Sequence, residues 1–317
     1  MSIIEKAVDK LSAGSGEQQG VSHGQDATSD ICNAVEELKD TNQVLPDRPI
    51  DSKHSAERPD LARQINQGPA PSMVLPLDKL KSAGMVTHDA PRSRIAEEYR
   101  SIKRPLLMNI AGKGATIIDN ANLVMVTSAL EGEGKTFSAI NLALSIAMEQ
   151  DKTVLFVDAD ISKASAGKLL GLPGDLPGLI DVLLDRGKGI EEMLVQTNIP
   201  NLRLLPAGQA SDHATELLAS EAMHSVMLEL SQRYSDRVII FDSPPLLMTT
   251  EASVLANLMG QIVFVVAADQ TSQAAISEAI THLGEDKIIG MVLNKANRKI
   301  GAKHGYGYGY GYGYGKE

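Results

Sequence analysis

The sequence predicts an α/β domain in which a mostly parallel sheet is covered by helices on both faces. The expected strands are short apolar runs at 123–126, 153–158, 202–206, 237–242, 261–267 and 287–293. Segments of helical composition or periodicity separate most of these runs. Continuous apolar runs, rather than alternating ones, indicate strands that are buried on both faces, which is typical of parallel sheets with helical connections.

Composition excludes several classes of protein. The 317 residues carry a formal net charge of -10, which argues against a protein that coats nucleic acid, because such binding uses Lys and Arg to neutralise phosphates. A single cysteine, Cys32, excludes an intrachain disulfide. The chain shows no apolar leader and no run of about 18 apolar residues, so we expect a cytoplasmic protein that can still dock on a membrane partner.

The first 72 residues are predicted to form a largely disordered arm. Residues 1–70 contain no Phe, Tyr or Trp and are rich in Ser, Gly, Gln, Asp and Lys. Such a stretch buries too little apolar surface to offset its ordering entropy. Two segments, Ile3–Leu11 and Ser29–Lys39, have amphipathic helical spacing. They are equally compatible with docking helices for a partner and with marginal helices in a disordered arm.

A folded domain is expected over residues 73–298, and its first helix is predicted at 94–104. Asp89–Ser93 supplies a helix start, and Ile95, Tyr99 and Ile102 fall on one side. Its other side carries Glu97, Arg100 and Lys103 at intervals of three residues. This spacing predicts that the three alternating charges share one face of the helix. A solvated face and an interface both explain that pattern.

A glycine-rich turn separates the strand at 123–126 from the apolar run at 137–148, which is expected to be a helix. The turn ends in Gly134-Lys135-Thr136, the P-loop arrangement of strand, loop and helix. In a P-loop the backbone N–H groups face a polyphosphate, Lys135 reaches the terminal phosphates, and the Thr136 hydroxyl can ligate Mg²⁺. Ala129 stands where the motif usually has glycine. The alternative, a turn that contains a lysine by chance, does not account for the flanking elements.

Acidic residues follow two of the other predicted strands. Asp158 ends the strand at 153–158 and Asp160 follows two residues later. Asp242 ends the strand at 237–242 after four apolar residues, in the Walker B manner. Parallel strands bring their carboxyl ends to one edge of the sheet, so these side chains are expected beside Lys135. A strand-end Asp is often only a helix cap or turn former. Three of them behind a P-loop favour an active site. Further helices are expected at 179–184, at 214–234 and between 267 and 287.

The last segment, residues 299–317, is predicted to be a flexible tail. Gly and Tyr alternate from Gly305 to Gly315, so five of the seven tyrosines lie there: Tyr306, Tyr308, Tyr310, Tyr312 and Tyr314. Alternating glycine disfavours a stable helix or strand. The tail is either a sticky low-complexity string or a set of phosphate acceptors. Full phosphorylation would add a charge of about -7.5 to -10.

With the P-loop, the strand-end acids and the tyrosine tail, the chain resembles the bacterial tyrosine kinases that autophosphorylate a C-terminal tyrosine cluster, and more narrowly the autokinases of exopolysaccharide loci. The resemblance implies ATP and Mg²⁺. Asp158 would help to activate the tyrosine hydroxyl, while Thr136, Asp160 and Asp242 would support the metal. The implied nucleotide-binding residues are Glu131, Gly132, Glu133, Gly134, Lys135, Thr136, Phe137 and Asn294, of which Asn294 would read adenine.

The resemblance also implies partners. Glu97, Arg100 and Lys103 match a helix used for ring-forming subunit contacts, although Lys103 stands where the family has Arg. The family often has Arg soon after the paired acids, whereas this chain has Ile161-Ser162-Lys163. Further implied partners are a separate membrane-embedded regulator of polysaccharide chain length, which would hold the protein at the inner membrane, and a tyrosine phosphatase.

Two other functions remain open from the sequence. A septum- or plasmid-positioning ATPase has the same fold, but its loop carries an early second lysine where this chain has Leu130 and Glu131. A nucleotide-gated adaptor without transfer chemistry would use the tail only as a contact surface. Intact Lys135, Asp158 and Asp242 weigh against the adaptor.

Overall fold

One eight-stranded sheet organises the part of the chain that the structure describes, in the strand order β1-β4-β5-β3-β6-β2-β7-β8. The structure is a computed structural model and describes residues 71–184, 189–209, 211, 213–233, 237–284 and 287–296. Its strands are β1 (Ser72–Met73), β2 (Leu123–Ser128), β3 (Thr153–Asp158), β4 (Val195–Thr197), β5 (Leu202–Leu205), β6 (Arg237–Asp242), β7 (Gln261–Ala267) and β8 (Ile288–Asn294). Only the β4–β5 pairing is antiparallel. The predicted mostly parallel sheet is confirmed.

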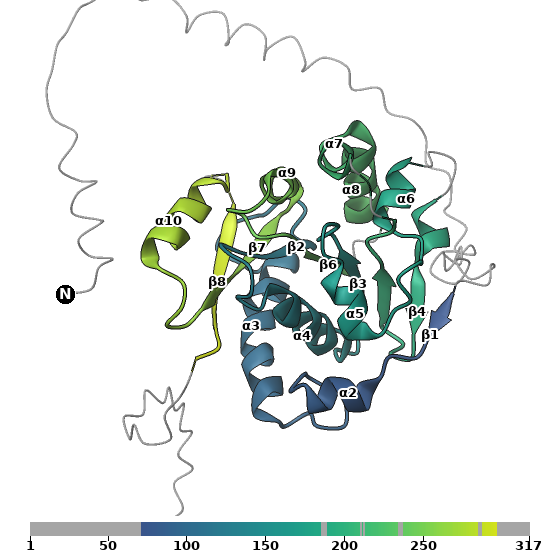
Figure 1. Cartoon of the computed structure of the whole chain (residues 1–317). Coiled ribbons are helices and arrows are strands. Elements are labelled where there is room, and N and C mark those ends of the chain that lie inside the picture. The colour runs from purple at the N-terminus through teal and green to yellow at the C-terminus, as the bar shows by residue number, and fades with distance from the viewer. Residues whose placement is uncertain are drawn as a thin grey trace, which may run out of the picture. The chain divides into compact units, whose positions relative to one another are not determined.

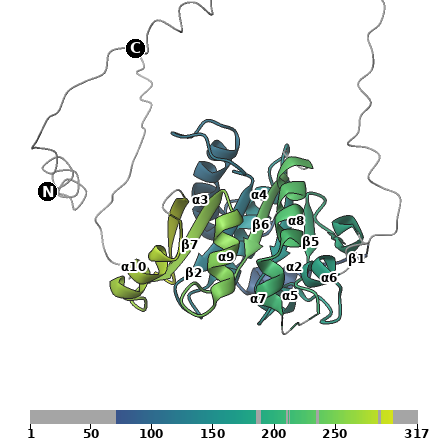
Figure 2. The same cartoon turned by 90° about the horizontal axis from the view of Figure 1, so that it is seen from above.

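Helices cover both faces of this sheet (Figures 1 and 2). The helices α2 (Leu77–Ser82), α3 (Arg94–Ile110), α4 (Lys135–Ala147) and α5 (Ser165–Leu170) pack on one face. The other face is covered by α6 (Leu179–Leu184), the 3-10 helix η2 (Ile190–Met193), α7 (Ala214–Leu218), α8 (Glu221–Arg233), α9 (Thr250–Leu258) and α10 (Gln273–Thr281). The sheet therefore lies between two helical layers.

The continuous apolar runs follow from this burial on two faces. Along β2, Leu123 and Met125 point into one core and Val124 and Val126 into the other. All six residues of β2 are buried. Six predicted strands therefore appear within a residue or two of their expected ends, whereas β1 and β4, of two and three residues, were not predicted.

Two helices differ from their predicted bounds. The single helix expected at 214–234 is wrong, because the chain breaks between α7 and α8. The Ser220 hydroxyl accepts a hydrogen bond from the Met223 N–H at 3.3 Å and donates to the Leu217 carbonyl at 2.7 Å, so Ser220 starts a new helix. Helix α3 continues past Arg104 and through Pro105 to Ile110, since the buried Leu106 anchors its last turns in the core.

Several predictions lie outside the described residues. These are the disordered arm up to residue 70 with its two amphipathic segments, and everything beyond Ala296, including the five tail tyrosines. They stay predictions. Within the described residues, no helix combines the length and apolar character needed to span a bilayer.

Candidate active site

The P-loop joins β2 to α4 and takes its shape from two glycines. Gly132 and Gly134 have φ of +76° and +97°, a left-handed backbone that favours glycine. At Gly134 the space is also limited, since a Cβ there would lie 2.1 Å from Asn294 Nδ2. Helix α4 begins directly after it at Lys135. The turn thus presents a helix N-terminus and loop amides to one edge of the sheet, a geometry suited to phosphate.

Strand pairing brings the predicted acids to the same edge. In register, Asp242 at the end of β6 pairs with Asp158 of β3 on one side and with Val126 of β2 on the other. Asp160 follows two residues after β3. The structure therefore places the three acids at one edge of the sheet, where Lys135 contacts Asp160.

Lys135 and Asp160 form a buried ion pair. Lys135 Nζ lies 2.5 Å from Asp160 Oδ2, and their side chains are 11% and 1% exposed. The second oxygen of Asp160 accepts a hydrogen bond from the Ser162 hydroxyl at 3.1 Å. The lysine that is expected to bind phosphate is thus held by a carboxylate in this structure.

The other two carboxylates are short of partners. Neither oxygen of the fully buried Asp242 has a hydrogen-bond partner among the described residues. Burial raises the pKa of Asp242 to about 8, although Lys135 nearby acts in the opposite direction. Asp158 accepts one hydrogen bond from the Gly167 N–H at 3.3 Å, its other oxygen has no partner within the described part, and burial raises its pKa to about 7. These oxygens need a cation or protons.

The donor set fits a hard divalent cation such as Mg²⁺. It contains carboxylate oxygens and the Thr136 hydroxyl, which lies 3.0 Å from the Ser165 hydroxyl. Among the described residues no cluster of three or more His, Cys, Asp and Glu side chains could hold a metal alone. This is consistent with Mg²⁺, which usually keeps several waters and takes ligands from substrate phosphates.

The remaining predicted nucleotide residues are used in different ways. The Glu133 side chain is buried and accepts hydrogen bonds from the Leu130 N–H at 2.7 Å and from the Thr271 hydroxyl, so its carboxylate is occupied within the protein. Asn294 Nδ2 donates to the Glu133 carbonyl at 2.9 Å. Glu131 forms an exposed ion pair with Lys163. Phe137 packs against the core below the loop.

Sequence reasoning missed Ser165 and Thr271, which touch the P-loop from other loops. Ser165 is 29 positions from Thr136, and Thr271 is 138 positions from Glu133. No motif marks either residue, because each contact depends on how separate loops pack. The family often has Arg soon after the paired acids. In this chain the basic residue there is Lys163, and it pairs with Glu131.

The charged face predicted on α3 needs a correction. Arg100 pairs with Glu97, and both are exposed, as predicted. Lys103, however, is 6% exposed, donates to the Ser145 carbonyl at 2.6 Å and pairs with Glu149 at 2.5 Å. Each step of three residues falls short of a full helical turn by about 60°, so Lys103 is rotated away from Glu97 and toward α4. Lys103 still lines one groove with Glu97 and Arg100, but it is buried there and does not belong to a solvated face.

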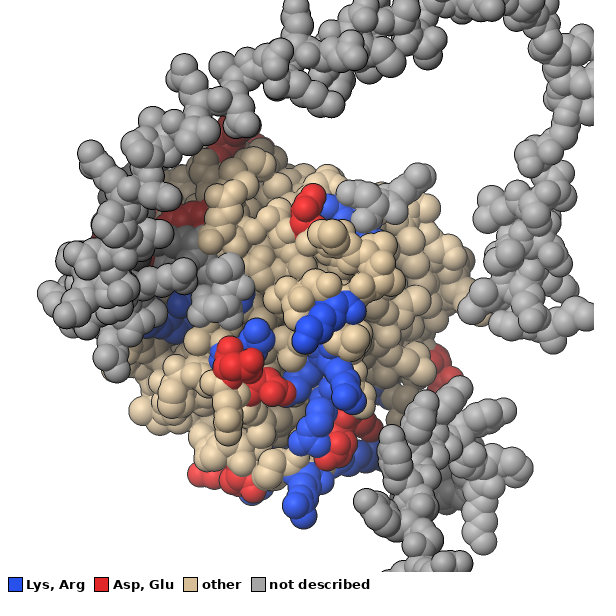
Figure 3. Space-filling view, turned by 180° about the vertical axis from the view of Figure 1, so that it is seen from behind, with Lys and Arg blue, Asp and Glu red and all other residues tan. Residues whose placement is uncertain are grey.

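Charged side chains of both signs gather in a band on the face seen in Figure 3. Separately, a groove of about 820 Å³ runs beside α3 and is lined by residues that include Glu97, Arg100, Arg104 and Lys113. Its mixed charge suits a polar protein contact better than an apolar ligand.

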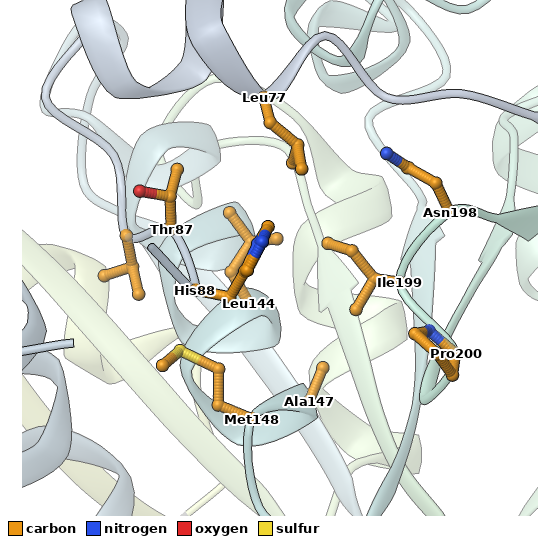
Figure 4. Close-up of a pocket in the computed structure, with 10 residues that line it drawn as sticks. Leu77, Thr87, His88, Leu144, Ala147, Met148, Asn198, Ile199 and Pro200 are labelled. Atoms are coloured by element: carbon orange, nitrogen blue, oxygen red, sulfur yellow. The ribbon is translucent and has the colours of Figure 1, made fainter. Parts of the chain in front are cut away.

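A second cavity lies at the opposite end of α4 from the P-loop (Figure 4). It has a volume of about 320 Å³ and is lined mainly by apolar side chains, including Leu77, Leu144 and Ile199. Within the described part of the chain, no acidic residue lines it. This cavity is therefore not part of the carboxylate site.

Comparison with known proteins agrees with this geometry. A family model for an AAA domain matches residues 122–290, which contain the P-loop and all three acids. The fold and the site thus define a P-loop nucleotide-binding domain.

The relatives narrow the class further. Tyrosine-protein kinase YwqD of Bacillus subtilis (strain 168) is 32% identical over 218 residues, covering 68% of this chain and 87% of YwqD. The putative tyrosine-protein kinase CapB of Staphylococcus aureus is 28% identical, covering 67% of this chain and 89% of CapB. The crystal structure of the chimerical protein CapA2B2 matches with a TM-score of 0.58 and 25% identity, over 72% of this chain and 94% of that one. The chain belongs to the bacterial tyrosine-protein kinases. Together with its P-loop, this membership implies that it binds ATP.

Proposed function

We propose that this kinase transfers the γ-phosphoryl group of ATP, with Mg²⁺, to the tyrosines of its own C-terminal tail. The observation that carries the proposal is the cluster of Lys135 with three buried carboxylates at the P-loop edge of the sheet, in a chain that ends in five Gly-spaced tyrosines. Family membership and the tail favour this function over a positioning ATPase and over an adaptor.

The transfer step assigns a role to Asp158. A tail tyrosine Oη attacks the γ-phosphorus, the Oη–P bond forms, and the bond from that phosphorus to the oxygen of the leaving ADP breaks. The hydroxyl proton passes to Asp158, whose Oδ1 has no partner among the described residues. The products are phosphotyrosine, ADP and one proton, so atoms and charge balance.

Lys135, Thr136, Asp160 and Asp242 would bind the phosphates and the cation. Lys135 has to exchange Asp160 for phosphate oxygens, which frees Asp160 to join Thr136 and Asp242 around the metal shell. A bound Mg²⁺ would supply positive charge to offset the negative charge that develops on the phosphates during transfer. The chain's part is to hold these oxygens in a buried, water-poor site.

The adenine base of ATP would lie beside Asn294. One N–H of its amide already holds the Glu133 carbonyl, which leaves Oδ1 and the second N–H for an adenine edge, a pairing that Asn makes well. From Glu131 to Thr136 the loop would contribute mainly backbone N–H groups, since the Glu131 and Glu133 carboxylates are engaged elsewhere.

Transfer is proposed to occur in trans within a ring of subunits. About ten residues link Ala296 to Tyr306, and a flexible segment of that length spans roughly 17 Å on average. Exposed Glu97 and Arg100 would make the subunit contact, and Lys103 would support it by fixing α3 on α4. By family resemblance, a membrane-embedded regulator would activate the kinase at the inner membrane, a phosphatase would reverse it, and exopolysaccharide synthesis would be the process controlled.

A mixing experiment tests the proposal. Lys135→Met protein with an intact tail is incubated with ATP, Mg²⁺ and active protein that lacks residues from Gly305 onward, after phosphatase treatment of both. We expect phosphate on the tail of the inactive protein, detected by intact mass. If full-length wild type labels itself while the mixture shows no label, transfer in trans is wrong. If wild type consumes ATP without gaining mass, the autokinase itself is wrong.

A further inference from the structure

Lys295, directly after β8, touches the P-loop although it is 163 positions away from it in sequence. Its ammonium donates a hydrogen bond to the Gly132 carbonyl at 2.6 Å and a longer one to Gln270 Oε1 at 3.3 Å. The side chain therefore spans from the end of the sheet to the middle of the phosphate-binding loop. Lys295 is exposed, so water competes for its ammonium and the net contribution of each bond is modest.

The backbone of Lys295 is in an unfavourable conformation. Its φ is +58°, in the left-handed region that residues with a Cβ rarely adopt. Lys295 is one of four non-glycine residues with positive φ in the described chain. Another is Asp269, with φ of +59°, on the loop after β7. Such conformations persist where the surrounding contacts require them, and they cluster at functional sites.

Lys295 completes a set of contacts that holds two consecutive P-loop carbonyls. Asn294 Nδ2 holds the Glu133 carbonyl, and Lys295 Nζ holds the Gly132 carbonyl. The Asn294 backbone is fixed in turn, because its carbonyl accepts from the Ala268 N–H at 2.8 Å. A loop whose carbonyls are held from one side can turn its N–H groups toward the other side, where a phosphate would lie.

We propose that Lys295 is a positioning residue for nucleotide binding, which holds the Gly132 peptide so that the P-loop is formed before phosphate arrives. It would also couple the base-binding end of β8 to the phosphate loop, since Asn294 and Lys295 are adjacent. The inference rests on the proposed nucleotide site and adds to it a residue outside the P-loop.

The test compares Lys295→Ala, Lys295→Gly and Lys295→Arg by ADP affinity and by hydrogen exchange of residues 130–134 without nucleotide. ADP supports no phosphoryl transfer, so the result does not depend on tail phosphorylation. We expect Ala and Gly to weaken ADP binding roughly three- to tenfold and to speed amide exchange in the loop. Arg, which keeps the charged donor, should recover most of the affinity.

The glycine variant separates the ammonium from the backbone. Glycine accepts the left-handed φ without strain, so a role for the backbone alone predicts wild-type ADP affinity for Lys295→Gly, and that result would overturn the proposal. Unchanged affinity in Lys295→Ala would overturn it as well.

Lys287→Ala is the matched control. Lys287 lies just before the other end of β8 and also donates to backbone carbonyls, those of Asn257 and Met259. It should bind ADP as wild type does. If wild type itself fails to bind ADP, the proposed function is wrong, whereas the exchange experiment still measures whether Lys295 orders the loop.

Discussion

At the scale of single residues, the site is defined by charges that are buried before any nucleotide arrives. Lys135 and Asp160 neutralise each other, while Asp242 and Asp158 have unpartnered oxygens within the described structure. Removing one partner of a buried ion pair costs more than removing both, because the remaining charge stays buried without compensation.

The cost of leaving one buried charge unpaired predicts how substitution of Lys135 changes the free energy of unfolding. Lys135→Met should lower the free energy of unfolding by about 3–5 kcal/mol, because it leaves Asp160 unpaired, whereas the double variant Lys135→Met/Asp160→Asn should lose much less. Urea unfolding measures both. Both variants should lack kinase activity. Equal destabilisation of the two would show that the pair is not coupled as the structure indicates.

The buried carboxylates predict an unusual pH dependence in protein free of nucleotide and divalent cations. Asp242 has a folded pKa of about 8 against an ordinary value of 3.8, so between these values the folded protein holds a proton that the unfolded chain has lost. Stability should therefore fall as pH rises from about 5 to 8, by up to roughly 1.4 kcal/mol per pH unit for each such proton.

Asp242→Asn is the variant that isolates this effect. The amide cannot ionise, so unfolding measured across the same pH range should show a shallower slope and higher stability at pH 8. A slope that matches that of wild type would contradict the assignment to Asp242. Asp158, with a pKa of about 7, accounts for the slope that remains.

At the scale of elements, apolar runs predicted the strands well because burial on both faces leaves little freedom of composition. The position of the strand-end acids was also predictable, because parallel strands bring their carboxyl ends to one edge of the sheet. Side-chain partners were not predictable in this way. The spacing put Lys103 on a charged face with Glu97 and Arg100, but could not show that its ammonium is buried against a carbonyl on α4. Ser165, Thr271 and Lys295 reach the P-loop across loops whose packing no local pattern encodes.

The break between α7 and α8 gives a prediction at the same scale. Ser220→Ala removes the cap of α8 and should cost about 1 kcal/mol of unfolding free energy. Ser225→Ala is the matched control, since Ser225 is exposed inside α8 and only bonds back to the Glu221 carbonyl. Its effect should stay within about 0.5 kcal/mol. If the two variants unfold alike, Ser220 does not cap the helix.

At the scale of the whole molecule, the proposed ring depends on the exposed end of α3. Arg100→Glu places like charges beside Glu97 on a surface that contributes little to folding, because exposed ion pairs are worth about 0–1 kcal/mol. We expect analytical ultracentrifugation to show smaller assemblies and trans-labelling to fall, with the unfolding transition nearly unchanged.

A control separates this contact from general charge effects. Arg94→Glu alters another exposed arginine of α3, which pairs with Glu98 and lies nearer the start of the helix. Should both variants assemble as wild type does, α3 is not the subunit contact.

The central claim is that the nucleotide site acts on the chain's own tail. The direct measurement is intact mass after phosphatase treatment and incubation with ATP and Mg²⁺, for wild type beside a variant with Phe at positions 306, 308, 310, 312 and 314. Wild type should gain up to five phosphates and the variant none, since the account places every acceptor in the tail; of the two other tyrosines, Tyr99 is 5% exposed and Tyr234 lies outside the described residues. Equal phosphate gain in both proteins, or ATP turnover without any gain in mass, would contradict the account.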